Sequence, residues 1–340
     1  MDNSIISNKF KSFALKECQG SSDLYEFLSL RIADDEELLN LASEAGEGQP
    51  VPNLLFGAIH YLLLKGMDHG LKEFYPTIVE YPRGEEESFF YFKEFCRLYS
   101  QQIKELLKTK LVQTNEVRRC SYLFPVFHFI HEQSKKPLAL IEIGTSAGLQ
   151  LLWDKYCYSY GTREVYGDQE SKVHLSSEIK GSRKPIFPES IPPVASRLGI
   201  DLHTNDLNDK EDYLWLNSLI WPEHQERRAL FEKAAECVKE NPITLIQGDG
   251  VQLLPELIKD MPDGHAICVF HTHVANQMPA KTKEKLLQEI KRIGQNRDIF
   301  HIYNNIQDRD LHLDYYLESH EHKRVAGKTE GHGKWFTWEL

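Results

Sequence analysis

The segment IEIGTSAGLQLL, residues 141–152, carries an acidic residue and two glycines at a spacing that suits a ligand-binding turn. Glu142 lies near the end of a short apolar stretch, and Gly144 permits a tight turn after it. Gly148 lets a following helix approach a sheet closely. With Thr145 inside this turn, the amino end of the helix would face a ligand. A side chain at Gly144 is then expected to occupy the ligand's space.

Acidic residues also end two later apolar segments. Asp201 lies in GIDL, with Asp206 shortly after it, and Asp249 with Gly250 follows ITLIQG. A carboxylate is an acceptor with two oxygens, which suits neighbouring hydroxyls or an amino group. Asp249 also precedes the helical pattern VQLLPELIK, where a short carboxylate is a good N-cap. The two roles of Asp249 are compatible.

The spacing E-x-G-x-x-x-G differs from the dinucleotide fingerprint and from the phosphate-binding loop, which needs Gly-Lys-Ser/Thr. It resembles motif I of class I S-adenosylmethionine-dependent methyltransferases. Residues of about 100–305 also resemble an uncharacterised bacterial family, domain of unknown function 2332, which is similar to methyltransferases in fold. The blocks that carry this likeness are TNEVRRCSYLFP, IEIGTSAGLQLLWDKY, VASRLGIDLHTNDLND, WLNSLIWPEHQERR, QGDGVQLLPEL and VFHTHV.

The methyltransferase resemblance implies S-adenosylmethionine as the cofactor. The resemblance implies that Asp201, or Asp206 as the nearby alternative, accepts hydrogen bonds from the ribose hydroxyls. It also implies that Asp249 accepts from the adenine amino group. Gly250 would let the backbone approach the ligand. In the segment TNEVRRC, Arg119 could hold the methionine carboxylate by a two-point contact while Asn115 and Glu116 bond its amine. The alternative for this segment is an ordinary helix start capped by Thr114 or Asn115.

Two departures from the superfamily stand out. Asp201 comes 53 positions after Gly148, whereas the acidic residue of a compact unit comes roughly 20 residues on. Asp168 has that spacing, but GIDL is the better strand pattern, which favours Asp201. The fourth strand ends in FHTHVANQMP in place of the Asn-Pro-Pro-Tyr of amide methyltransferases, so methylation of amides is not expected.

Two histidines, His271 and His273, follow the fourth predicted strand. Side chains alternate across a strand, so only one of the two can face a cleft, and His271 is the first choice. A histidine there could act as a general base toward a methyl acceptor or orient it. A hydrogen-bonded histidine at a strand end is the structural alternative. No H-E-x-x-H pattern occurs, so no metal ligand is assigned.

Three functions follow from these residues. The first is an S-adenosylmethionine-dependent methyltransferase whose acceptor is a small molecule. The second is a metal-dependent hydrolase that uses His271 and His273, and the third is a non-catalytic regulatory protein that binds an adenosyl ligand. A net charge of -11 gives no general attraction to nucleic acid or to anionic membranes. Widely spaced cysteines and the lack of a leader or membrane-spanning run predict a cytoplasmic protein.

The elements that must position these residues divide the chain in two. Residues 1–135 show helical periodicity and predict an all-helical N-terminal region or lid, with Pro125 expected to kink or restart the last helix. Residues 136–340 alternate short apolar strands with helical stretches, including one at 149–160 and one at 212–240. This alternation predicts a Rossmann-like α/β domain with crossover helices and an insertion at about 160–194. LHLDYYLESH and GKWFTWEL are expected to form a C-terminal antiparallel hairpin.

Overall fold

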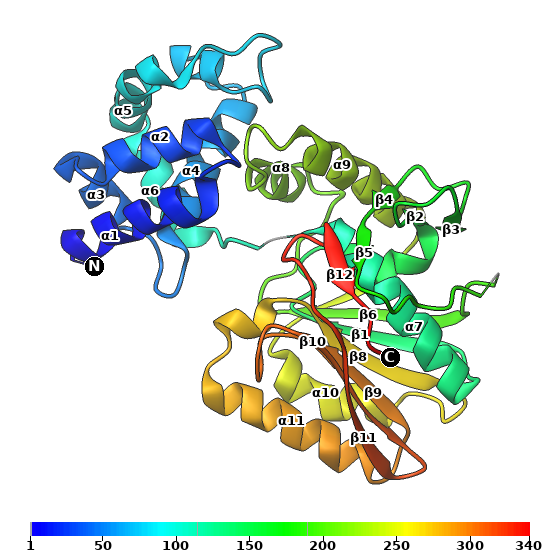
Figure 1. Ribbon diagram of the computed structural model, residues 1–340. Coiled ribbons are helices and arrows are strands. Elements are labelled where there is room, and N and C mark those ends of the chain that lie inside the picture. Colours follow the sequence, from blue (N-terminus) through cyan, green and yellow to red (C-terminus); the bar gives the residue numbers. More distant parts are fainter. Residues whose placement is uncertain (1, 114, 189) are drawn as a thin grey trace. The chain divides into compact units, whose positions relative to one another are not determined.

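The computed structural model describes residues 2–113, 115–188 and 190–340 (Figure 1). The described residues form two compact units, one from 1–114 and 208–229 and the other from 115–207 and 230–340. The division therefore differs from the predicted boundary near residue 135. The segment after residue 115 joins the α/β unit because Phe127 stacks on Trp153, with ring centroids 4.7 Å apart. Residues 208–229 join the helical unit, where Trp215 meets Tyr61 edge to face at 5.8 Å.

The helical unit is built on apolar faces that cover one another. Phe56 of α4 stacks on Tyr25 of α2 at 4.1 Å, and Trp221 meets Phe13 at 5.3 Å. No described helix of the chain is both long and apolar enough to cross a membrane. The helices of this unit are α1 Asn3–Phe13, η1 Ala14–Cys18, α2 Asp23–Ile32, α3 Glu36–Ala42, α4 Val51–Leu64, η2 Gly70–Phe74, η3 Glu85–Glu87, α5 Ser88–Leu98, α6 Ser100–Thr109 and α8 Lys210–Ser218; the division falls within α9 Gln225–Glu240.

The α/β unit is organised on a seven-stranded sheet in the order β11-β10-β9-β8-β1-β6-β7. The five strands from β9 to β7 are parallel, and β10 and β11 are antiparallel to their neighbours. Their bounds are β1 Leu138–Ile143, β6 Val194–Asp201, β7 Thr244–Gln247, β8 Ala266–His271, β9 Ile299–Tyr303, β10 Leu311–Leu317 and β11 His320–Gly327. The parallel part has the strand order 3-2-1-4-5 of doubly wound folds. The predicted Rossmann-like α/β class is confirmed.

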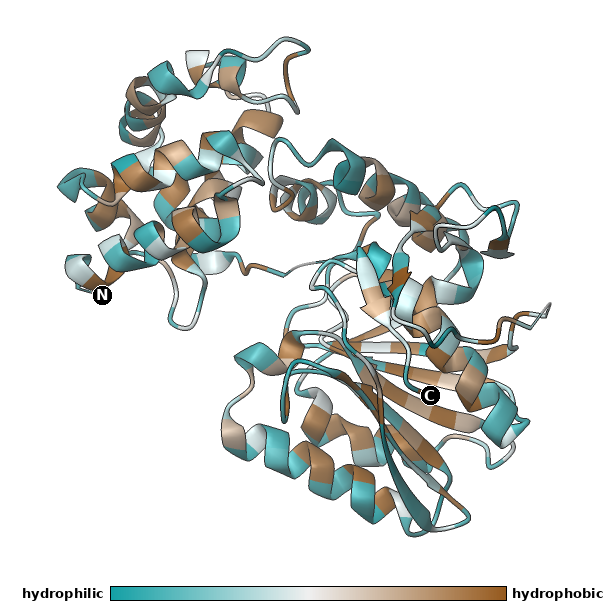
Figure 2. Ribbon diagram, in the orientation of Figure 1, coloured by the Kyte–Doolittle hydropathy of each residue, from teal (hydrophilic) through white to brown (hydrophobic). Residues whose placement is uncertain are grey.

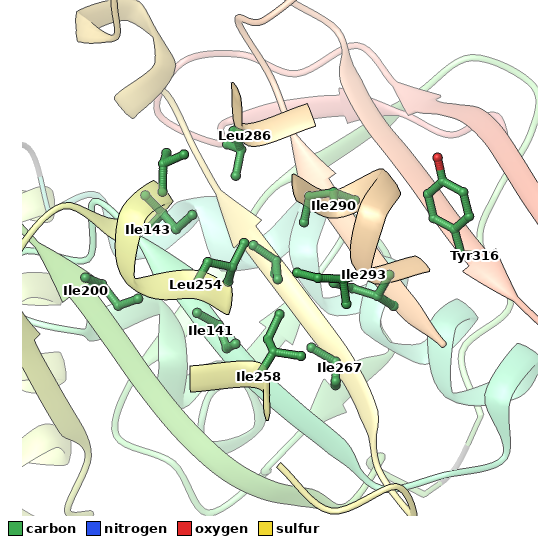
Figure 3. Packing of buried hydrophobic residues seen from close by; sticks show 13 residues of the cluster. Ile141, Ile143, Ile200, Leu254, Ile258, Ile267, Leu286, Ile290, Ile293 and Tyr316 are labelled. Carbon is green, nitrogen blue, oxygen red and sulfur yellow. The ribbon is translucent and has the colours of Figure 1, made fainter. Parts of the chain in front are cut away.

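Apolar side chains on both faces of the sheet hold the layers together. Figure 3 shows the face where α10, Gly250–Lys259, and α11, Ala280–Gly294, pack through Leu254, Ile258 and Ile290 onto Ile141 and Ile267. On the other face, α7, Cys120–Ser134, rests Phe127 against Phe270 of β8 at 5.4 Å. Figure 2 accordingly shows brown strands and, on α11, a mixture of brown and teal residues. The parallel strands β1, β8 and β9 are buried along their whole length, as in helix-covered parallel sheets, whereas β6 and β7 are partly exposed.

The predicted C-terminal hairpin exists, but its second strand is not GKWFTWEL. β10 pairs with His320–Gly327 across a turn in which Glu318 and Ser319 both have positive φ. The GKWFTWEL segment instead forms β12, Trp335–Thr337, which pairs in parallel with β5, Glu178–Lys180, of the insertion. The insertion also places β3 Val165–Gly167 and β4 His174–Ser176 on either side of β2 Cys157–Ser159. The insertion is thus paired with β2 on one side and with the C-terminal strand β12 on the other.

The helix expected directly after Gly148 is also different. Leu149–Lys155 forms the short 3-10 helix η5, with non-helical dihedrals at Leu152. All six residues from Leu149 to Asp154 are buried, so the segment has no solvent face. An amphipathic α-helix needs such a face, whereas a continuously buried segment is free to follow the shape of the core.

Pro125 lies inside α7 without restarting it. Its missing N–H leaves the carbonyl of Ser121, four residues earlier, without its helical donor. The buried hydroxyl of Tyr160, from the insertion, donates to this carbonyl at 2.8 Å. The helix therefore continues because another segment replaces the lost hydrogen bond.

We expect Tyr160→Phe to lower the free energy of unfolding by about 1–2 kcal/mol, because a buried carbonyl loses its donor. The Pro125→Ala background returns a backbone N–H to the helix, so the same tyrosine change should cost clearly less there. Thermal or urea unfolding of the unmodified protein, the two single variants and the double variant measures both costs. Equal costs in the two backgrounds would show that the hydroxyl does not replace the missing N–H.

Candidate functional site

The sequence-predicted residues meet at one edge of the parallel sheet. β1, β6, β7 and β8 run in the same direction, so the residues that follow them gather at their carboxyl ends. Strand order reverses between β1 and β8, because β6 and β7 lie beyond β1 on one side and β9 lies beyond β8 on the other. Ligands of open α/β sheets bind at such a switch point. The turn that begins at Gly144 lies at this position.

The turn after β1 depends on glycine at two points. Gly144 and Gly148 have φ angles of 75° and 77°, which favour glycine. A Cβ at Gly144 would lie 2.5 Å from Cγ2 of Val274, the residue that begins the 3-10 helix η6 Val274–Gln277 after β8. The space at Gly144 that was expected to hold a ligand is therefore occupied by a neighbouring side chain. Gly148 similarly faces Ile243, whose Cδ1 would lie 2.2 Å from the added carbon.

Ser146 is the centre of a hydrogen-bond network that fixes the turn. Its backbone N–H donates to Oδ2 of Asp201 at 2.8 Å, which joins the turn after β1 to the end of β6. Its hydroxyl oxygen accepts from the side-chain amides of Asn115, at 2.6 Å, and Asn205, at 2.9 Å. Asn115 thus supports the turn from the segment before α7. Sequence reasoning named Asn115 and Asp201 but missed Ser146 and Asn205, although Ser146 lies inside the quoted motif.

Glu142 lies beneath this turn, only 3% exposed. The hydroxyl of Thr145 donates to its Oε2 at 2.7 Å. Burial, with a smaller contribution from nearby Asp201, raises the pKa of Glu142 to about 8 against the opposing effects of Thr145 and Arg119. Glu142 is therefore mainly protonated at neutral pH, a neutral polar group at the end of β1.

Arg119 reaches the opposite side of the switch point from the end of η4, Val117–Arg119. Its Nε donates to the carbonyl of Gly331 at 2.9 Å, and a terminal nitrogen lies 3.4 Å from both oxygens of Thr272. Thr272, directly after β8, donates to Gln150 at 3.1 Å. Arg119 brings a positive charge to the edge, and its side chain is buried.

The segment before η4 was expected to begin with a cap at Thr114 or Asn115. Thr114 lies outside the described residues, and Glu116 caps η4 by accepting from the N–H of Arg118 at 3.2 Å.

Asp249 follows β7 and is the N-cap of α10. Its Oδ1 accepts from the backbone N–H groups of Val251 and Gln252 at 2.9 and 3.2 Å, and Oδ2 accepts from the Gln252 side chain at 2.9 Å. The structural role proposed for this residue is therefore present. Gly250 allows α10 to approach β1, since a Cβ there would lie 2.9 Å from Ile143.

The two alternative ribose ligands lie differently. Asp206 is exposed in the loop after β6. Asp168 lines a pocket together with Val194, the first residue of β6, Pro193 before it, Arg197 and Asp154. Asp168 therefore lies away from the carboxyl edge, and its sequence spacing from Gly148 does not bring it to the turn.

His271, the first choice for the cleft, is a core residue. His271 is 0% exposed and shares its parity on β8 with Ile267 and Val269, on the face that α10 and α11 cover. Its Nε2 lies 3.3 Å from Nε2 of His301, and burial lowers its pKa to about 3. His271 thus belongs to the core rather than to a cleft, because its side chain lies on the covered face of β8.

His273 is the histidine that leaves the strand. It has a φ of 66°, and its N–H donates to Oδ1 of Asn304 at 2.8 Å. Its Nε2 is buried and makes no hydrogen bond within the described residues. Burial, with smaller contributions from Arg119 and His332, lowers its pKa to about 3. A neutral imidazole with an available ring nitrogen therefore lies near the switch point.

Metal coordination has no support from the described residues, among which no group of three or more His, Cys, Asp or Glu could hold an ion. His271 has His301 as its neighbour, but among the described residues no carboxylate or thiolate completes a ligand set with that pair. The metal-dependent hydrolase hypothesis needs His271 and His273 as metal ligands, so the described residues give it no support.

Comparison with known proteins identifies the family. A family model described as "Uncharacterized protein conserved in bacteria (DUF2332)" matches residues 7–338. The chain belongs to the DUF2332 family. The match extends the resemblance noted for 100–305 to nearly the whole chain, including the helical unit. Searches of curated proteins and of solved structures each found no match. DUF2332 membership by itself assigns no reaction, since a fold hosts many functions.

Proposed function

We propose that this DUF2332 protein binds S-adenosylmethionine at the carboxyl edge of its sheet and methylates a small molecule. The observation that carries the proposal is the hydrogen bond between Ser146 and Asp201. It links a glycine turn after the first strand to a carboxylate that ends the second, at the switch point of a 3-2-1-4-5 sheet. In doubly wound folds such a carboxylate contacts ribose hydroxyls.

The side chains at this edge suit the parts of the cofactor. Asp201 and Asp249 supply acceptors for ribose hydroxyls and an amino group, and Arg119 supplies a cation for a carboxylate. Gly144, with its positive φ, keeps the turn compact. When bound, S-adenosylmethionine would supply an activated methyl group. The protein would hold the ligand in place and keep water from part of the site.

On the acceptor side, His273 takes the place that the sequence gave to His271. Its unpartnered Nε2 can accept a hydrogen bond from an acceptor's hydroxyl or amine and so orient it. A pKa of about 3 makes it a weak base, so its contribution is positioning more than proton removal. We also propose that the reaction takes place in the cytoplasm, where the free cysteines would stay reduced.

The low pKa of both histidines favours a second candidate, a regulatory protein that binds the adenosyl ligand without turning it over. The two functions share the same binding site. Mass spectrometry under native conditions, which would detect a co-purified adenosyl ligand, tests the shared part. Consumption of the cofactor in the presence of candidate acceptors separates the two.

Asp249→Asn is expected to weaken S-adenosylmethionine binding roughly tenfold or more without unfolding α10. Asparagine caps helices about as well as aspartate, but its amide presents a donor where the carboxylate presents only acceptors. Loss of a hydrogen bond to a charged group costs about 1.5–3 kcal/mol. Isothermal titration calorimetry of the folded variant measures the change in affinity.

Asp209→Asn is the matched control. Asp209 caps α8 in the same way, accepting from Glu211 and Asp212 at 2.8 and 3.0 Å, and it belongs to the helical unit. Both variants should keep the melting temperature of the unmodified protein, and only Asp249→Asn should lose affinity. Unchanged affinity in the Asp249 variant would remove Asp249 from the site, and no binding to the unmodified protein would refute the proposal.

A further inference from the structure

A second pocket lies on the outer side of α7, where the insertion covers it. It has a volume of about 520 Å³, within the range of small-molecule sites. Phe124 and His128 of α7 form one wall, Tyr166 of β3 a second, and Phe187 with its neighbouring prolines a third. The residues of the carboxyl edge do not line it. His128 follows Arg119 by nine positions, which in a helix is about 13 Å.

Aromatic rings make up much of the wall. Phe187 lies 4.2 Å from Tyr166 and 5.9 Å from Phe124, measured between ring centroids. Tyr160 stacks behind Phe187 at 4.9 Å with an interplanar angle of 10°. These contacts hold the rings in place before any ligand arrives. Preformed aromatic walls favour a flat ring system, which can stack on them or meet their edges.

His128 contributes an unsatisfied acceptor to this apolar wall. It is 2% exposed, and its Nδ1 lies 2.9 Å from the carbonyl of Phe124, one helical turn earlier. Burial lowers its pKa against the smaller opposing effects of the Phe124 and Ser190 carbonyls, so the ring is neutral at pH 7. With Nδ1 donating to Phe124, Nε2 carries a lone pair and has no hydrogen-bond partner among the described residues.

A lone pair buried without a partner is costly, and a donor on a ligand would remove that cost. The Ser190 carbonyl cannot do so, because it is itself an acceptor. A ring N–H in the plane of a flat ligand has the required chemistry. The Nε2 atom of His128 can therefore accept a hydrogen bond from a ligand bound in the aromatic pocket.

Glu164 gives the pocket its charge. It is exposed and is the one Asp, Glu, Lys or Arg among the described residues that line the pocket. Its carboxylate accepts from the hydroxyl of Tyr166, which keeps it beside the aromatic wall. A carboxylate next to π faces favours a cationic group over an anionic one.

We propose that this pocket is an accessory site for an aromatic amine, with a ring N–H donating to His128 and a cationic amine near Glu164. The site is separate from the proposed cofactor edge and does not depend on it. Its occupant would bind where the insertion meets α7, the helix that leads from Arg119 to β1.

Tryptamine is the probe, because it joins a flat ring, one ring N–H and one ammonium group. Titration by NMR or calorimetry should show saturable binding to the unmodified protein. 1-Methyltryptamine, which lacks the ring N–H, should bind about tenfold more weakly. Indole-3-acetate keeps the ring donor but reverses the charge, and it should bind a few-fold more weakly.

Two variants separate these contributions. His128→Phe should reduce tryptamine affinity to that of 1-methyltryptamine, and Glu164→Gln should abolish the preference for tryptamine over indole-3-acetate while keeping the Tyr166 contact. Asp249→Asn should leave tryptamine affinity unchanged, which distinguishes this site from the cofactor edge. Absence of saturable tryptamine binding to the unmodified protein, or equal affinity for tryptamine and its 1-methyl form, would overturn the proposal; the latter comparison needs no variant to fold.

Discussion

Replacing Glu142 with Gln is expected to stabilise the protein strongly at alkaline pH and only slightly near pH 5. Burial raises the pKa of Glu142 to about 8 in the folded protein, against an ordinary value of 4.5. Between these two values the unfolded chain has released the proton while the folded protein still holds it. The stability of the unmodified protein therefore falls as pH rises from about 4.5 to 8, and it does not fall further above that range.

Glutamine removes this dependence because it is neutral at every pH and keeps an oxygen to accept from Thr145. The advantage of the variant should grow from about 1 kcal/mol at pH 5 toward about 5 kcal/mol at pH 9. For a unit of this size that corresponds to an increase in melting temperature on the order of 10 °C. Calorimetric scans of both proteins at the two pH values measure it.

Glu256→Gln is the control for the loss of a carboxylate, since Glu256 is exposed on α10 of the same unit. It should follow the pH dependence of the unmodified protein. If Glu142→Gln also followed that dependence, Glu142 would be ionised in the folded state, and its place as a neutral group beneath the turn would be wrong.

The centre of the sheet could be predicted from the sequence because β1, β8 and β9 are buried along their whole length and are therefore continuously apolar. The segment LALIEI forms β1 residue for residue. The strands β6, β7, β8 and β9 overlap the later apolar segments. The same uniform burial misled the prediction for residues 149–155. There the apolar residues suggested a helix with one buried face, but every side from Leu149 to Asp154 is covered. Periodicity cannot separate a regular helix from a short turn of this kind when no face is exposed.

Strand topology places some of the candidate site residues from the sequence, but it does not place the histidines at the end of β8. Acidic residues that end strands must gather at one edge, so Glu142, Asp201 and Asp249 could be placed there from topology alone. The histidines required one more fact, namely where the chain turns after β8. His271 shares the face of Ile267 and Val269 wherever the strand ends, and the pattern FHTH does not show that the chain turns at His273. The sequence named both histidines, and only the structure shows that His273 is the one that leaves the strand.

The second large effect expected is a loss of about 3–4 kcal/mol in Gly144→Ala. A left-handed φ of 75° costs an L-residue about 1–2 kcal/mol, and the new Cβ would lie 2.5 Å from Val274. Overpacking of this kind adds about 1–3 kcal/mol, since Val274 is β-branched and stiff. Gly148→Ala is the matched comparison, because its φ of 77° is almost the same but its new Cβ meets the flexible end of Ile243. It should cost about 1–2 kcal/mol.

Val274→Gly removes the colliding atoms, so it should recover the overpacking part of the loss in the Gly144→Ala background and leave the part due to φ. Urea unfolding of the single and double variants gives the coupling between the two positions. No coupling would mean that the turn and η6 move apart at little cost. If the coupling is present, a loss of cofactor affinity in a Gly144 variant has two explanations. The new side chain can displace η6, or it can block the ligand directly. Asp249→Asn is therefore the cleaner test of the cofactor, because it changes one carboxylate and leaves both glycines of the turn in place.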